Sequence, residues 1–465
     1  MVLNIIQREI RHHILSLRLH ITLLLTLTIF GLGTIAFVKS HSEEQAEYTK
    51  YHTEFIEQSR KAAESNLTKL AVKRQNLVLE PRGDAFITDS KEKYLPNRFD
   101  FSGYNVFGFD IRPGSANPYL NTFQELNWVF IVSIIISFTV LLFTFDTVSG
   151  EKEAKTLAAT LSNPVSRGAL LFGKYLSMII TTLLVLAPGM ALSLIILLIS
   201  GAVAITPVVA GEIIGFLVSV FFLVACIAAF GILSSVLTRN ANISLLVALT
   251  LWLVFVVIVP NTAVFWARRL FPIEKVETVW ERISREREEI NRNAPKGSWS
   301  SSGDNPFLPQ HELRANNQTN LMNSQMKILN AYYGEMFRQY ERARMLTFLS
   351  PLSVFEYMSE AVVGGGYVRF QKVWRDLHAW QTQFLAYFKE VDAKDPDSPH
   401  WYNPYEDYST TRKGVSFEQV PVFKEKSLPL RERISYASLY LLITVLYTAL
   451  AFVLSFVLFL RYDVR

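Results

Sequence analysis

Residues 209–237 read VAGEIIGFLVSVFFLVACIAAFGILSSVL, and Glu212 is the one charged side chain in this run. The hydrocarbon core of a bilayer is about 30 Å thick, which a helix crosses with about 20 apolar residues. Inside lipid, a helix satisfies its own backbone hydrogen bonds, so this run predicts a membrane-spanning helix. The composition agrees, because 50% of the 465 residues are hydrophobic and only 19% are charged.

Five further apolar stretches are long enough to cross a bilayer. They lie at 21–38, 128–145, 175–199, 243–259 and 436–460. We therefore predict a mainly α, polytopic membrane protein with six transmembrane helices. A polar turn at 238–242 joins the fourth and fifth spans, and the first span lacks a clear cleavage site, so we expect an uncleaved anchor.

Basic residues gather near the ends of the spans on one side of the predicted membrane. Lysine and arginine in short loops favour the cytoplasm, so this side and both chain termini are predicted to be cytoplasmic. The opposite short connection, 201–208, contains no basic residue. The basic residues are Arg8, Arg11, Arg18, Lys152, Lys155, Arg167, Lys174, Arg239, Arg461 and Arg465.

Two polar inserts, 39–127 and 261–434, are predicted to form a mostly helical extracytoplasmic domain. In the first insert we expect a helix from 43 to about 77. In the second insert the helix candidates are 275–291, 310–346 and 368–389.

The last of these helices has an apolar stripe at spacings of three and four residues. We favour a helix-packing face over a lipid-binding or apolar-substrate surface. The glycines at 364–366 precede it and indicate a flexible break, because no strand comes before them, as a phosphate loop would require. The stripe is Phe370, Val373, Leu377, Trp380, Phe384 and Phe388.

The first twenty residues predict an amphipathic helix in the plane of the membrane. Its apolar stripe is Leu3, Ile6, Ile10, Ile14 and Leu17.

The predicted cytoplasmic loop, 146–174, follows the second span. Residues 145–157 read FDTVSGEKEAKTL, and 161–167 read LSNPVSR before Gly173 and Lys174. Ser149 is predicted to cap a short helix, with Glu151 and Glu153 in its first turn, where carboxylates complement the helix dipole.

The same loop has an apolar face. Leu157 and Leu161 are four residues apart, Pro164 ends the helix, and Ser166 is predicted to cap the next one. A helix of this kind suits insertion into a groove of a partner protein. An interfacial connector without a partner is the alternative.

This loop closely resembles that of ABC-2-type transporter permeases, which share the Ser-Gly-Glu-Lys-Glu run, the Thr-Leu pair and the Pro-Val-Ser-Arg segment. The resemblance implies a bacterial cytoplasmic (inner) membrane protein whose coupling helix contacts a separate ABC ATPase subunit. It also implies an ATPase contact for Gln7, Arg8 and Arg11, with a membrane-surface anchor alone as the alternative. The residues it assigns to coupling are Asp146, Ser149, Gly150, Glu151, Lys152, Glu153, Thr156, Leu157, Leu161, Pro164 and Arg167.

Two shorter stretches resemble permeases with a large extracytoplasmic insert, which are linked to copper-enzyme maturation and gliding motility. They are Asn117-Pro118-Tyr119-Leu120, and Leu349-Ser350-Pro351-Leu352-Ser353 followed by Phe355-Glu356-Tyr357. The resemblance allows an extracytoplasmic protein partner. The eight histidines are scattered and there is one cysteine, Cys226, so we predict neither a metal site nor an intramolecular disulfide.

Residues 168–174, GALLFGK, have the spacing of a phosphate-binding P-loop. Tyr175 replaces the Ser/Thr that would bind Mg²⁺, and a membrane span follows at once, so we reject nucleotide binding here. We predict no cofactor on this chain and no enzymatic activity of its own. ATP and Mg²⁺ are expected on the partner ATPase.

Within the spans, Pro188 and Gly189 predict a bend that serves either gating or a static kink. Glu212 is expected to be solvated at the membrane interface rather than to bind a cationic substrate.

The leading hypothesis is a permease that pairs with a second copy or a homologue, surrounded by membrane lipid. The alternative is an ABC-type subunit that transmits motion to an external protein or lipid without transport, and a scaffold without an ATPase is disfavoured. The small net charge of +5, without a basic and aromatic cluster, argues against a nucleic-acid partner.

Overall fold

The computed structural model describes residues 2–89, 95–110, 126–162, 165–296, 309–406 and 408–462. In this part of the chain, six helices are long and apolar enough to cross a membrane. This confirms the predicted mainly α, polytopic fold with six spans. The helices are Leu17–Ser65, Trp128–Glu153, Arg167–Ser200, Pro207–Leu237, Ala241–Leu270 and Leu430–Arg461.

Three spans are single helices in the membrane bundle: α9 (Arg167–Ser200), α10 (Pro207–Leu237) and α17 (Leu430–Arg461). Between Leu223 and Val236, α10 is buried on all sides except at the partly buried Phe230, and α10 packs against both α9 and α17. The large apolar core of the protein lies around α10.

Two other spans contain a π-helical segment, where the helix is locally wider. The second span consists of α5 (Trp128–Phe130), η2 (Ile131–Ile136) and α6 (Ser137–Thr144) and continues into a short helix described below. The fifth consists of α11 (Ala241–Leu253), η3 (Val254–Ile258) and α12 (Val259–Leu270).

The first span is part of α2 (Leu17–Ser65), which continues without a break far beyond the predicted end at residue 38. At 1.5 Å per residue its 49 residues extend for about 73 Å. The helix predicted to reach residue 77 is wrong beyond Ser65. There the Asn66 side chain accepts a hydrogen bond from the Thr68 backbone N–H and starts α3 (Leu67–Val72).

A three-stranded antiparallel sheet follows α3 and was not predicted. Its strands are β1 (Gln75–Val78), β2 (Arg98–Phe101) and β3 (Val106–Asp110), in the order β1-β2-β3. The register pairs Leu77 with Phe99 and Phe99 with Phe109, and a bulge lies at Asp100 and Phe101.

The sheet packs against α16 (Gly366–Asp392). Five residues of the predicted stripe are at most 4% exposed, while Trp380 is partly buried and donates to the Pro421 carbonyl. Phe99 and Phe101 of β2 contact this stripe, at Phe370 and Trp380. The stripe is therefore a packing face, as predicted.

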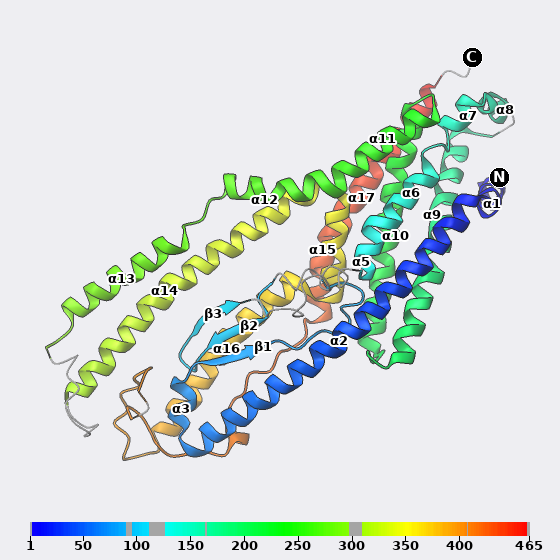
Figure 1. Ribbon diagram of the computed structural model, residues 1–465. Helices are drawn as coiled ribbons and strands as arrows, with labels where there is room; N and C mark the ends of the chain where they lie inside the picture. Colours follow the sequence, from blue (N-terminus) through cyan, green and yellow to red (C-terminus); the bar gives the residue numbers. More distant parts are fainter. Residues whose placement is uncertain are drawn as a thin grey trace.

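The fifth span continues to Leu270, beyond the predicted start of the second insert at 261. It is followed by α13 (Val276–Asn293) and α14 (Pro309–Leu346), which pack together and extend away from the bundle (Figure 1). A 3₁₀ turn (Thr347–Leu349) leads to α15 (Pro351–Val363), which was not predicted. Unlike α13, α15 packs on α10 and α17 of the membrane bundle. Of the glycines predicted as a flexible break, Gly364 is the C-cap of α15 at a left-handed φ of 73°, Gly365 is the N-cap of α16, and Gly366 is the first residue of α16.

The molecule has two ends with different architecture (Figure 1). At the first, named the loop end, lie α1 (Val2–Ile14), the loop after the second span and the end of α17. At the other lies the insert domain, made of α2 beyond residue 38, α3, the sheet, α13, α14, α16 and the segment up to α17 with its 3₁₀ turn (Phe417–Gln419), while α15 joins it to the membrane bundle. The helix α2 connects the two ends.

Candidate functional site

The loop that was predicted to couple to a partner folds into two short helices at the loop end. They are α7 (Ser149–Glu153) and α8 (Thr156–Ser162). Lys155 lies between them with a left-handed φ of 56°, which turns the chain between the two helices. Pro164 lies outside the described residues.

One buried cation connects three helices at this end. The Nζ of Lys174 on α9 lies 2.9 Å from Oε1 of Glu151 on α7 and 3.1 Å from Oε1 of Glu9 on α1, and the lysine side chain is 5% exposed. A buried ammonium group requires such partners, because its transfer from water is otherwise very costly. Glu151 is therefore an internal ion-pair partner, which its position in the first turn did not reveal.

The next two residues of α7 hold the turn between α10 and α11. Lys152 Nζ donates to the carbonyls of Val236 (2.6 Å) and Thr238 (2.9 Å). Carbonyl groups at the C-terminal end of a helix such as α10 have no N–H donor within the helix. Glu153 Oε2 accepts from the backbone N–H of Ala241 (2.9 Å), at the start of α11. These contacts complement both helix ends, since cations favour C-termini and carboxylates favour N-termini.

The expectation that Ser149 caps α7 is wrong. Ser149 lies within the helix, and its hydroxyl donates to the Phe145 carbonyl at 2.8 Å. Ser235 of α10 takes the capping role instead, because its hydroxyl oxygen accepts from the backbone N–H groups of Val148 and Ser149, both at 2.9 Å. Gly150 follows on the half-buried face of the helix, with Asp146 beside it.

Two more predicted residues fix the ends of neighbouring spans. Asp146 accepts from Arg18 of α2 at 2.7 Å. Arg167 Nη1 donates to the carbonyls of Leu460 (2.7 Å) and Tyr462 (2.9 Å) at the end of α17. Ser166 caps α9 by accepting from the N–H of Ala169, as predicted.

The apolar side of α8 faces the protein itself. Leu157 is 3% exposed and Leu161 is partly buried, and both belong to the core of the bundle. The opposite surface consists of small or polar exposed side chains. These are Glu153, Ala154, Lys155, Thr156, Ala158, Ala159 and Ser162.

The predicted bend at Pro188 and Gly189 lies inside α9, which continues through both residues. Gly189 is in close contact with α2, because a Cβ atom there would lie 2.9 Å from the side chains of both Thr26 and Phe30. The glycine therefore permits close packing of α2 and α9. A gating role of this segment stays a prediction.

The interfacial solvation expected for Glu212 is wrong. The residue is 5% exposed, and Arg433 at the start of α17 donates from Nη1 to its Oε1 at 2.5 Å. Arg433 is far away in the sequence, which is why the pair was not foreseen.

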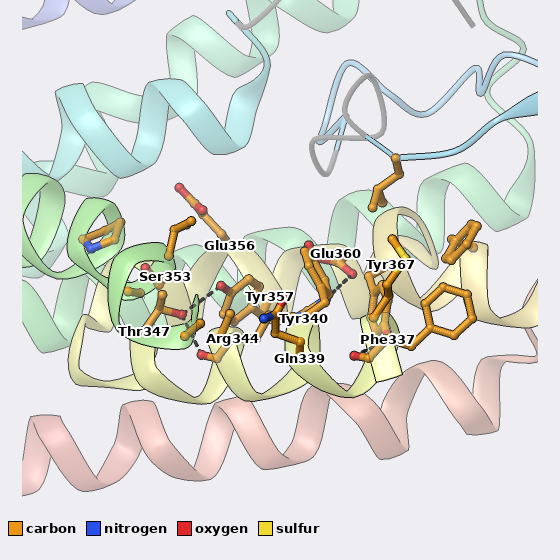
Figure 2. A pocket seen from close by; sticks show the side chains of 18 of the residues that line it. Phe337, Gln339, Tyr340, Arg344, Thr347, Ser353, Glu356, Tyr357, Glu360 and Tyr367 are labelled. Atoms are coloured by element: carbon orange, nitrogen blue, oxygen red, sulfur yellow. Dashed lines mark hydrogen bonds and ion pairs between the residues drawn. The ribbon is translucent and has the colours of Figure 1, made fainter. Parts of the chain in front are cut away.

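A cavity of about 580 Å³ lies where α12, α14 and α15 meet (Figure 2). Its lining is mainly apolar. Arg344 Nη1 lies 2.9 Å from Glu360 Oε1 in its wall, and the arginine lies over the Tyr357 ring at 4.0 Å. Burial raises the pKa of Glu360, and the Arg344 guanidinium opposes this shift.

This cavity was missed at the sequence level because its walls come from separate segments of the chain. One local signal was present, since Ser350 followed by Pro351 is typical of a helix N-cap and its first position. That signal predicts α15, and Ser350 does cap it. In the described part of the chain, no group of three or more His, Cys, Asp or Glu side chains is arranged to bind a metal ion.

The family model for ABC-2 family transporter proteins matches residues 3–464, nearly the whole chain. The chain therefore belongs to this family, and the protein is a multi-pass membrane component of ABC transport. No protein in the curated set matches the chain.

Proposed function

We propose that this chain is the permease subunit of an ABC-2 transporter driven by a separate ATPase subunit that docks on the exposed surface of α7 and α8. The single observation that carries this proposal is the division of α8 into two faces. Leu157 anchors it to the bundle, while Ala158, Ala159 and Thr156 are open to a partner. ATP and Mg²⁺ then belong to the partner, and this chain has no catalytic role.

Movement of α8 reaches the spans through α7. Glu151 connects it to Lys174 of α9, and Lys152 connects it to the end of α10. The loop therefore links α9 to the end of α10, so that a displacement of α8 by the ATPase moves both helices together. A second copy or a homologue of the chain completes the translocation path.

The proposed membrane is the bacterial cytoplasmic membrane, with the loop end and both termini in the cytoplasm. The support is the clustering of basic residues in short segments at the loop end. Cys226 is buried, so introduced cysteines can be labelled over a low background. An impermeant thiol reagent on intact cells should label Gln58→Cys in the insert domain but not Ala158→Cys, and the reverse pattern would invert the topology.

The docking proposal is tested with Ala158→Arg, which places a large cation on the exposed face of α8. ATPase activity of the complex purified with its native partner should fall about tenfold, the size of effect expected at an interface. Ala46→Arg is the matched control, because Ala46 is an exposed alanine of α2 in the insert domain. Equal activity of both variants would contradict docking at α8.

A second candidate function is transmission of motion to the insert domain without transport. The observation that favours it is α2, a continuous helix from the loop end to the sheet. Ser42→Pro would break this helix between the two ends. If motion is transmitted through α2, the Ser42→Pro variant keeps ATP hydrolysis and loses the action of the insert domain on its external target. In the same case, vesicles that contain the wild-type complex take up no substrate. Substrate uptake by those vesicles would exclude this second function.

A further inference from the structure

The cavity shown in Figure 2 lies where two membrane helices meet the insert domain. Val129 and Phe130, at the start of the second span, form part of its wall. Pro260, Ala263 and Ala267 of α12 form another part, beyond η3 in the fifth span. The cavity is therefore placed at the level where both spans leave the membrane.

The length of the fifth span supports this placement. Its 30 residues from Ala241 to Leu270 extend for about 45 Å, about 15 Å more than the hydrocarbon core of a bilayer. The excess corresponds to α12, whose outward face exposes Phe265 and Trp266 and is followed by Arg268 and Arg269. Aromatic rings next to arginines are typical of the membrane interface.

Three polar side chains of the cavity wall, Arg344, Glu360 and Gln339, have partners within the protein. Arg344 pairs with Glu360, and Gln339 Nε2 donates to the Phe271 carbonyl at 2.6 Å. The remaining surface there is mainly apolar, with Phe337 and Phe370 among the lining residues. An occupant of the interior should therefore be a hydrocarbon group without polar atoms.

At its exposed rim the cavity offers a positive charge. Arg268 lines the cavity, is exposed, and makes no hydrogen bond or ion pair with the described residues. The acidic lining residues Asp89 and Glu356 each have an interaction within the protein, whereas Arg268 has none with the described residues. Arg268 is therefore the charged lining residue that is open to an acidic group of an occupant.

We propose that this cavity binds an amphiphile with an acidic head group, its hydrocarbon chain between α12, α14 and α15 and its head group at Arg268. The volume of about 580 Å³ falls in the range of about 300–1,000 Å³ that is usual for small-molecule sites. The amphiphile enters from the bilayer beside α12. This binding needs no ATPase and is independent of the function proposed above.

The test is cross-linking of a photoactivatable C16 fatty acid to the full-length protein in phosphatidylcholine vesicles, with the labelled peptides identified by mass spectrometry. We expect labelling within 260–273, 336–347 and 353–370. Ala267→Trp, which fills the cavity, should abolish it. Phe265→Trp is the control, because Phe265 is an exposed residue of α12 that does not line the cavity.

A second pair of variants tests the head group even if Ala267→Trp does not fold. Arg268→Glu should weaken labelling about fivefold, the effect of losing one exposed charge contact, whereas Arg269→Glu should not. Unlabelled palmitate and phosphatidylglycerol are compared as competitors, which tells a free fatty acid from a phospholipid. Three results would overturn the proposal. Added lysophosphatidylcholine competes as well as the acidic lipids, the Arg268→Glu and Arg269→Glu variants are labelled equally, or labelling is confined to the other spans.

Discussion

The loop end and the insert domain are held together by different forces. At the loop end, Lys174 and its two glutamate partners join α1, α7 and α9 through a buried charge cluster, and α1 also packs against α9. In the insert domain, the rings on α16 pack against the sheet and α3. Charge pairs depend on one geometry, whereas apolar packing is distributed over many contacts. The loop end therefore depends on a small number of charge contacts, and the insert domain depends on distributed apolar packing.

The largest effect is expected from truncating the apolar core of the insert domain. Phe388 is fully buried, and Phe388→Ala should destabilise this domain by about 4 kcal/mol through the lost transfer energy and the cavity left behind. Hydrogen exchange of α16 and the sheet, followed by mass spectrometry, measures the loss. Phe265→Ala serves as the control, because Phe265 is 63% exposed. Equal protection of the two variants would show that the aromatic stripe does not hold the domain.

The next largest effect is expected from removing the central charge of the loop end. Lys174→Met leaves the Glu9 and Glu151 carboxylates without their cation, which should cost about 3 kcal/mol. Thermal unfolding in detergent measures it, with the exposed Lys50→Met as control. Adding Glu9→Gln and Glu151→Gln should restore much of the stability. If the Lys174→Met protein is as stable as the wild type, the ion pairs of Lys174 do not stabilise the loop end.

The smallest effects compare two serine caps of the same chemistry. Ser166→Ala at the loop end should cost about 1 kcal/mol, the usual value for a lost N-cap. Ser350→Ala should cost about 2 kcal/mol, because the fully buried Ser350 hydroxyl also donates to the Phe255 carbonyl at 2.6 Å. Chemical denaturation of both variants gives the difference. A larger loss for Ser166→Ala would reverse the expected order.

The sequence predicted most of what depends on the immediate neighbours of a residue. The six spans follow from apolar length, and the packing stripe of α16 follows from helical spacing. The cap at Ser166 follows from a serine at the start of an apolar run. The same local reasoning failed at Ser149, because a hydroxyl from α10 supplies the cap.

The partners of residues that make contacts far away in the sequence could not be predicted from their immediate neighbours. The sequence placed Lys174 in the loop motif and among the basic residues near a span but gave no ion-pair partner for it, and it predicted a solvated carboxylate at Glu212. Both residues are buried in ion pairs. The sheet was missed because its three strands have only four or five residues each. Such short strands are stable only once they pair with one another and pack on α16.

By itself, the sequence determined that this is a six-span protein, because lipid requires long apolar helices whatever their neighbours are. Its loop motif also determined the ABC-2 family, which the match over residues 3–464 confirms. Only the tertiary structure decided that Glu151 faces inward to Lys174, that α2 reaches from one end to the other, and that α12, α14 and α15 enclose a cavity. These features join residues far apart in the chain, and the free energy of burying and pairing them exists only after folding.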